Sequence, residues 1–447
     1  MKKYGVFIGL MALLIMGLAM VGCGSKAQPV AFRADIAPGT LSAEEFGKFY
    51  PKQYDTYLKN AEMSNEGSKY GGSLEYDKLT QWPFLKEIFA GYGFSIEYNE
   101  DRGHVYTLED VKKIKRINKD SIASCWTCKS ANVPGLIAEM GDSYYSTNFH
   151  DLTDKMIEPI TCANCHDPQT MRLIITQPPL RNALTRLGKN PDGLTTQELR
   201  TLVCAQCHVE YYFTDETKTV TFPWDKGFTP DDILEYYEEI AFVDWEHPRS
   251  KEGMIKVQHP EFETFLSSTH YEAGIACADC HMPYIMVGGE KISSHWWTSP
   301  LKHIKESCMT CHREDSAWLK ERVFYTQDRV AQMLARVGTV NVEAIEAIAA
   351  ANALGVTSPS ALDEARQLQR RAQFYVDWVG AENSMGFHNP QLILDTLYKS
   401  LDYATRAKAK AMEARTGIAF PTWDVEISKY NTEAVRLMQE KENLPPT

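Results

Sequence analysis

Residues 124–130 read SCWTCKS, and this short stretch decides how the rest of the chain is interpreted. Cys125 and Cys128 enclose two residues, and Lys129 follows directly. The same C-x-x-C spacing recurs four times with histidine in place of that lysine, as CANCH (162–166), CAQCH (204–208), CADCH (277–281) and CMTCH (308–312). Ten of the eleven cysteines fall in these five pairs, which indicates one kind of site built five times.

The four C-x-x-C-H units carry the attachment signature of c-type haem, in which two thiols bind the porphyrin and the adjacent histidine ligates the iron. Structural zinc would give no reason for histidine to follow the second cysteine four times. Disulfide frameworks usually staple shorter domains at irregular spacings, and thioredoxin-like pairs come singly. We therefore expect haem attachment at Cys162, Cys165, His166, Cys204, Cys207, His208, Cys277, Cys280, His281, Cys308, Cys311 and His312.

The N-terminus has the order of a bacterial secretory signal. Two lysines precede an apolar run and then small residues, in MKKYGVFIGLMALLIMGLAMVGC. Cys23, with Gly22 before it and Gly24-Ser25 after it, resembles a lipoprotein cleavage site, although Met20 replaces the usual leucine. We favour lipidation at Cys23, and the alternative is an uncleaved signal anchor. Either way, we expect the working domain outside the cytoplasmic membrane and tethered to it, in the periplasm or on the outer face of the cytoplasmic membrane.

The remaining chain predicts a mainly α-helical protein. From about residue 40 to 320, turn signals interrupt short apolar runs, which indicates short helices, long loops and few strands. Residues 314–350 and 358–415 have helical periodicity and predict long C-terminal helices, with Gly386, His388 and Pro390 breaking the last two. The formal net charge of −12 argues against nucleic acid as a partner.

Taken together, the motifs resemble the ammonia-forming pentahaem cytochrome c nitrite reductases, from about Phe46 to the end of the last long helix. The C-x-x-C-K unit is the most specific element, and the stretches DRGH (101–104), CHVEYYF (207–213), VQHPEFET (257–264) and CADCHMP (277–283) are similar as well. The resemblance implies a signal segment (1–23), a pentahaem catalytic core (24–320), and a long-helix region (321–447) that completes one haem site and forms a homodimer interface.

The resemblance gives the lysine in the first motif a role. It implies a fifth haem c attached at Cys125 and Cys128, with Lys129 as the iron ligand of the catalytic haem. An amine ligates iron only when it is neutral, so the fold must hold Lys129 desolvated against the metal. The opposite face of the iron would stay open to substrate.

The other four haems need a second ligand if they only carry electrons, because two imidazoles keep the iron six-coordinate. The resemblance pairs a distal histidine with each of the four C-x-x-C-H motifs, and His303 is the rival of His295. His150 and His247 have no assigned role. The expected pairs are His104 with the haem at 204–208, His270 with that at 308–312, His295 with that at 162–166, and His388 with that at 277–281.

Reduction of nitrite to ammonium also needs anion capture and proton delivery. The resemblance places Arg116, Tyr211 and His259 over the open iron, where they supply a fixed positive charge, a phenol and a proton donor. Arg102 is the rival of Arg116, which lies in the basic stretch KKIKRINK.

A calcium ion is expected beside these residues. The ligands would be the Glu210 carboxylate, the Gln258 side-chain carbonyl and the backbone carbonyls of Tyr211 and Lys256, because Ca²⁺ prefers oxygen ligands. The alternative is a simple salt bridge between Lys256 and Glu210.

Two functions therefore stay open from the sequence. The first is dissimilatory six-electron reduction of nitrite to ammonium, with a membrane-bound multihaem quinol dehydrogenase as the electron donor. The alternative is a cytochrome that only transfers electrons, in which Lys129 closes the fifth haem. A ligand-accessible iron would distinguish the first from the second.

Overall fold

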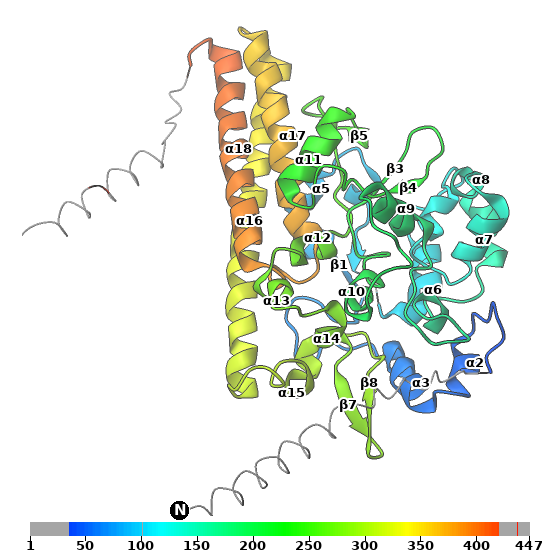
Figure 1. Ribbon diagram of the computed structural model, residues 1–447. Helices are drawn as coiled ribbons and strands as arrows, with labels where there is room; N and C mark the ends of the chain where they lie inside the picture. Colours follow the sequence, from blue (N-terminus) through cyan, green and yellow to red (C-terminus); the bar gives the residue numbers. More distant parts are fainter. Residues whose placement is uncertain (1–34, 101, 420–435, 437–447) are drawn as a thin grey trace, which may run out of the picture.

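A computed structural model describes residues 35–100, 102–419 and 436. The proposed lipoprotein cysteine, Cys23, lies outside the described residues. Within them, a broad region of short helices and loops packs against three long helices that stand side by side, α16, α17 and α18 (Figure 1). No helix in this part of the chain combines the length and the apolar character needed to cross a membrane.

Short helices and long loops form the haem-motif region. Because turn residues interrupt its apolar runs, few of its helices exceed two or three turns. Its α-helices are α2 (Ala43–Gly47), α3 (Pro51–Leu58), α4 (Lys78–Gln81), α5 (Phe84–Ile88), α6 (Thr107–Lys113), α7 (Val133–Met140), α8 (Ser143–Ser146), α9 (Pro178–Arg186), α10 (Thr196–Leu202), α11 (Pro230–Glu239), α12 (Glu261–Phe265), α13 (Thr269–Glu272), α14 (Cys277–His281) and α15 (Ile304–Ser307).

In the described residues, the strands form four separate two-stranded antiparallel sheets. In the longest, β7 and β8, Gly288 and Gly289 make the turn with φ of 57° and 84°. A two-residue turn with both φ angles positive matches the twist of the flanking strands, which explains the Gly-Gly pair. The strands pair as β1 (Tyr76–Asp77) with β2 (Asn99–Glu100), β3 (Tyr212–Phe213) with β4 (Val220–Thr221), β5 (Trp245–Glu246) with β6 (Gly253–Met254), and β7 (Tyr284–Val287) with β8 (Glu290–Ser293).

The long helices begin and end where the sequence predicts a change of conformation. α16 spans Ser316–Leu354, four residues longer than expected at its end, and α17 and α18 span Pro359–Ala381 and Pro390–Thr416. Proline stands at the first position of α17 and of α18, where its missing N–H costs nothing. The predicted break between the last two helices is confirmed, and it carries His388.

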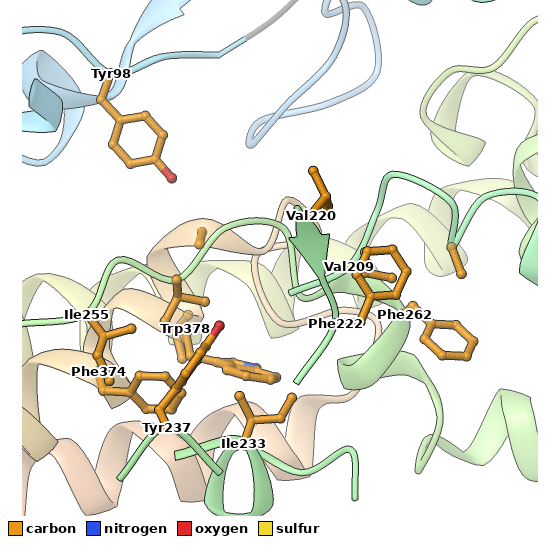
Figure 2. Packing of buried hydrophobic residues seen from close by; sticks show 14 of the residues in the cluster. Tyr98, Val209, Val220, Phe222, Ile233, Tyr237, Ile255, Phe262, Phe374 and Trp378 are labelled. Carbon is orange, nitrogen blue, oxygen red and sulfur yellow. The ribbon is translucent and has the colours of Figure 1, made fainter. Parts of the chain in front are cut away.

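Buried aromatic side chains join the long helices to the haem-motif region. Tyr237 of α11 packs edge-on against Phe374 of α17, with Trp378 and Ile255 close by (Figure 2). A fully buried ion pair, Lys256 Nζ to Asp377 Oδ1 at 3.0 Å, crosses the same junction. The segment that carries His259 is therefore fixed against α17 by both apolar and ionic contacts.

Candidate haem sites and active site

The cysteine motifs share a common local shape. All ten C-x-x-C cysteines are free thiols, which argues against a disulfide framework. In three motifs the backbone N–H of the histidine donates to the carbonyl of the first cysteine, in His166 at 2.9 Å, His208 at 3.0 Å and His312 at 2.9 Å. This single turn brings the imidazole beside the two thiols, as haem attachment requires.

Each of the four motif histidines lies near a partner histidine from another part of the chain. An imidazole nitrogen binds a metal at about 2.0–2.1 Å and the ring centroid lies roughly 1 Å farther, so two imidazoles on opposite faces of one ion hold their centroids roughly 6 Å apart. The four observed separations fit this spacing. They are His104 to His208 at 5.9 Å, His295 to His166 at 6.1 Å, His270 to His312 at 6.2 Å, and His388 to His281 at 6.2 Å.

His208 has a second histidine near it, because His259 lies 6.4 Å away. The Nδ1 atoms of His208 and His259 both face the carboxylate of Glu261, at 3.9 and 4.0 Å. The ring of His104 lies closer to His208 than the ring of His259 does, which favours His104 as the partner.

The rival to His295 occupies a different environment. His295 Nδ1 lies 3.0 Å from the carbonyl oxygen of Ser293, which leaves Nε2 directed at His166. His303 instead packs edge-on against Trp296 with ring centroids 4.9 Å apart. The geometry favours His295 as the partner of His166.

The two unassigned histidines hydrogen-bond to the backbone. His150 Nε2 lies 3.0 Å from the carbonyl of Asn118. His247 Nε2 lies 2.9 Å from the carbonyl of Glu87, and its Nδ1 accepts from the N–H of Ser250. Burial lowers the pKa of His247, so it is neutral near pH 7. Neither side chain reaches a cysteine motif.

Contacts between the cysteine motifs show how they follow one another. Cys128 Sγ of the first motif lies 3.9 Å from the backbone carbonyl of Gln206 in the third. The N–H of Cys277 in the fourth motif donates to Thr201 Oγ1, three residues before the third motif, at 3.4 Å. The motifs therefore form a series from the first to the third and on to the fourth.

The remaining two motifs attach to this series at different points. Burial and, second, the neighbouring Cys308 raise the pKa of Cys280 to about 12, which puts the fifth motif next to the fourth. Gln206 of the third motif donates to the carbonyl of Asn164 in the second at 3.0 Å, so the second motif also adjoins the third. The third motif, residues 204–208, is thus the hub of the array.

Lys129 lies on a rigid support. Its backbone N–H donates to the Trp126 carbonyl at 2.8 Å, and its carbonyl accepts from Thr107 Oγ1 at 2.7 Å. Trp126 is fully buried and stacks on Phe149 with centroids 4.1 Å apart. Burial raises the pKa of the Cys125 thiol, and the positive charges of Arg116 and Lys129 oppose this. Both cations therefore lie close to the thiols of the first motif.

Arg116 and its rival Arg102 have different partners. The Arg116 guanidinium lies 3.8 Å above the ring of Phe94, and its buried Nε has no hydrogen-bond acceptor. Arg102 is held by the carboxylate of Asp110, with Nε donating at 2.9 Å, and stacks on Tyr106. The geometry favours Arg116 as the arginine at the first motif.

Tyr211 is partly buried and lies near the first motif. Burial, followed by the thiols of Cys128 and Cys125, raises its pKa well above the usual range, and the charge of Arg116 opposes this. The phenol is therefore protonated at physiological pH and can donate a hydrogen bond. Arg116 and Tyr211 therefore lie near the first motif, and His259 lies beside His208 of the third motif.

The predicted calcium ligands also lie together. Glu210 is fully buried, and its Oε2 accepts from the backbone N–H of Gln258 at 2.5 Å. The Gln258 side chain reaches the carbonyl of Lys256, with Nε2 3.0 Å from the oxygen. Burial raises the pKa of Glu210 well above its usual range, although hydrogen bonds from Gln258 and Tyr237 oppose this. A buried carboxylate beside two carbonyl groups fits a hard cation.

The alternative salt bridge between Lys256 and Glu210 is wrong. Lys256 Nζ pairs with Asp377 and also donates to the Val257 carbonyl, because α17 brings Asp377 into the core. No group of three or more His, Cys, Asp or Glu side chains in the described residues is arranged to bind a metal, so a cation at Glu210 would depend on carbonyl oxygens.

Two buried side chains at the site had no role in the sequence interpretation. Glu261 lies between His208 and His259, and its Oε1 accepts from Asn383 at 2.9 Å. Gln206, a spacer residue of the third motif, hydrogen-bonds outside that motif. Glu261 lies in the stretch HPEFE (259–263), in which the sequence pattern indicated a role for His259 alone.

The fold and the site define a multihaem c-type cytochrome. The sequence profile of the cytochrome c552 family matches residues 42–444, so the chain belongs to that family. The cytochrome c nitrite reductase subunit NrfA of Nitratidesulfovibrio vulgaris is 39% identical, over 91% of this chain and 86% of that protein. Cytochrome c-552 of Bacteroides fragilis is 37% identical, over 92% of this chain and 85% of its own.

A solved structure gives the same result. The catalytic subunit NrfA of the Desulfovibrio desulfuricans cytochrome c nitrite reductase, described with two calcium sites, superposes with a TM-score of 0.82 at 39% identity. The match covers 89% of each chain. The family resemblance and the mainly helical fold with long C-terminal helices are confirmed.

Proposed function

We propose that this protein is an ammonia-forming nitrite reductase whose catalytic haem c is held by Cys125, Cys128 and Lys129. The observation that carries the proposal is the set of four imidazole pairs with ring centroids 5.9–6.2 Å apart, beside a fifth motif that has Lys129 in place of histidine. Relatives named cytochrome c nitrite reductase, at 39% identity over most of the chain, support it.

Five haem c groups follow from the five motifs, four of them with two histidine ligands. The four imidazole pairs at 5.9–6.2 Å support this ligation. When bound, the haem groups would supply redox centres, and the haem held by Cys125, Cys128 and Lys129 would be the one that takes nitrite. The contacts between the motifs support a path for electrons from the fifth, fourth and second motifs through the hub to the first.

The residues above the open position capture the anion and move protons. Arg116 carries a permanent positive charge, and its buried Nε–H offers a donor to an anionic ligand. Tyr211 stays protonated and donates a hydrogen bond. His259 supplies protons, because an imidazole exchanges them readily near neutral pH. The same groups would also serve hydroxylamine, nitric oxide or sulfite.

Calcium would hold this constellation from behind. A cation bound by Glu210, Gln258 and the carbonyls of Tyr211 and Lys256 would fix the two segments that carry Tyr211 and His259. It would also add positive potential beside an anion-binding pocket. The buried carboxylate of Glu210 supports the site.

The protein would work outside the cytoplasmic membrane, anchored through a lipid on Cys23. Its proposed electron donor is a membrane-bound multihaem quinol dehydrogenase. We further propose a homodimer built on the long helices. Large apolar side chains on those helices, Trp318, Tyr325 and Tyr398, are at least half exposed, which supports a covered face.

A spin-state measurement separates this proposal from a cytochrome that only transfers electrons. The holoprotein should contain one high-spin haem that binds nitrite or cyanide and four low-spin haems that do not. Electron paramagnetic resonance and optical titration of the purified holoprotein measure both properties. Five low-spin haems without ligand binding would establish the electron-transfer function instead.

A further inference from the structure

The hub motif contains a buried amide whose hydrogen bonds lie mostly outside that motif. Gln206 is a spacer residue of CAQCH and is 3% exposed. Its Nε2 donates to the carbonyl of Asn164 at 3.0 Å and to that of Val203 at 3.1 Å. Asn164 is itself a spacer residue, in CANCH. One side chain thus joins the backbone of the second motif to that of the third.

The other end of the same amide is saturated as well. Gln206 Oε1 accepts from the backbone N–H groups of Thr176 at 2.7 Å and Gln177 at 2.9 Å, and from Thr176 Oγ1 at 3.1 Å. Two donors and the carbonyl oxygen are the full capacity of a glutamine side chain. Every polar group of Gln206 is therefore used to hold chain segments together.

Gln177 continues the connection to the first motif. Its Nε2 donates to the carbonyl of Thr127, a spacer residue of CWTCK, at 3.0 Å, and the side chain is 1% exposed. Cys128 Sγ also lies 3.9 Å from the Gln206 carbonyl. Gln206, Gln177, Asn164 and Thr127 form what we call the amide clamp, which links three of the five motifs.

The clamp lies where the haem array branches. Each haem is bonded covalently to its cysteines, so the relative position of three peptide segments sets the relative position of three porphyrins. Electron transfer between porphyrins depends steeply on their edge-to-edge distance. A buried and fully satisfied hydrogen-bond network resists displacement, which suits it to hold such a distance.

We propose that Gln206 is a positioning residue that sets the spacing of the hub haem to the haems at 125–129 and 162–166, and thereby the rate of electron delivery to the catalytic site. This inference rests on the proposed function, because it requires haem at all three motifs. It assigns the spacer residues a role of their own, separate from ligand binding and proton transfer.

Substitutions at Gln206 and at Gln177 test two different parts of the amide clamp. Gln206→Met keeps the volume of the side chain and removes all five hydrogen bonds. Gln177→Met cuts the link to Thr127 in the first motif alone. Thr310→Ala is the matched control, because Thr310 is an exposed spacer of the fifth motif whose hydroxyl reaches only Ser307 and Cys311.

The experiment uses haem-loaded full-length enzyme that is fully reduced and then mixed rapidly with excess nitrite, with optical detection of haem oxidation. Gln206→Met should oxidise its low-spin haems severalfold more slowly than the wild type, because electron transfer falls steeply as the distance between porphyrins grows. Its KM for nitrite should be unchanged while kcat falls. Magnetic coupling between the high-spin haem and its neighbour should weaken in electron paramagnetic resonance.

Gln177→Met should weaken that coupling too, while electron exchange between the second and third motifs stays normal. Thr310→Ala should match the wild type in every readout. Wild-type oxidation rates and magnetic coupling in Gln206→Met would overturn the inference. If that variant does not mature with a full set of haems, wild-type coupling in Gln177→Met overturns it instead. Failure of wild-type enzyme to form ammonium would reject the proposed function, which is a different result.

Discussion

The imidazole rings of His295 and His166 lie 6.1 Å apart, although His166 ends the second cysteine motif and His295 follows the β7–β8 hairpin. His303, the other histidine of that segment, packs against Trp296 instead. We therefore expect His295→Met to change the ligand set of the haem at 162–166 and raise its reduction potential, as methionine ligation does. Redox titration followed optically measures this. His303→Gln is the control and should leave all reduction potentials unchanged. A shift of potential in His303→Gln alone would make His303, and not His295, the ligand of the haem at 162–166.

Arg116 and Arg102 make a second matched pair. Of the two arginines, Arg116 is the one whose charge opposes the rise in the pKa of Tyr211. Arg116→Gln should therefore lower nitrite reduction by roughly a hundredfold, the loss typical of a missing electrostatic contact to a reacting group. Arg102→Gln breaks a pairing with Asp110 and should retain most of the activity. Steady-state kinetics with haem content as the reference measures both. The opposite order of the two variants would make Arg102 the catalytic arginine.

Removal of calcium tests the cation site. We expect a chelator to lower activity and the unfolding midpoint together, and added Ca²⁺ to restore both. Glu210→Gln should lower activity by roughly 10–100-fold, as loss of a supporting residue at a metal site does, and should weaken the response to Ca²⁺. Glu263→Gln is the control, because an amide oxygen still accepts from Glu210 N–H and Trp224 Nε1. Full activity in metal-free protein would remove calcium from the account.

His247 predicts a pH dependence of stability away from the haems. Burial lowers its pKa below the ordinary value of 6.5. Its contribution to stability is therefore fully present above pH 6.5, and it is lost as the pH falls toward the folded-state pKa, because the unfolded chain binds the proton first. Thermal unfolding between pH 5 and pH 7.5 should show a smaller drop in His247→Asn than in the wild type. Equal slopes in the two proteins would contradict this role.

Covalent chemistry explains which parts of the site could be predicted from the sequence. The thioether bonds fix the spacing of Cys162 and Cys165, and the iron fixes the place of His166, so these residues are visible in one local stretch. Lys129 could be identified from the sequence for the same reason. The break before α18 could be predicted as well, because Pro390 and Gly386 restrict the backbone locally.

The parts that depend on distant segments could not be derived from local pattern. The pairing of His388 with His281 depends on how α17 and α18 return to the core, and it was expected only through the family resemblance. In the sequence, Asp377 is an ordinary polar residue of a helix, and only folding brings it to Lys256. Gln206 differs little from any other spacer until Asn164 and Thr176 surround it.

Lys129 is the centre of the account, and its replacement by histidine tests it most directly. Lys129→His converts the first motif into an ordinary C-x-x-C-H unit, so all five haems should still attach. Activity should fall strongly, because imidazole is bulkier and would shift the iron relative to Arg116 and Tyr211. Lys112→Gln is the control, since Lys112 lies 5.8 Å above Trp126 but outside the motif.

The decisive measurement is ammonium formed from isotopically labelled nitrite by wild type and Lys129→His, with a reduced viologen as donor and equal haem loading. The account predicts one labelled ammonium for every six electrons consumed by the wild type, and a small fraction of that rate in the variant. Unchanged ammonium formation by fully loaded Lys129→His would contradict the special role of this lysine, and no ammonium from the wild type would contradict nitrite reduction itself.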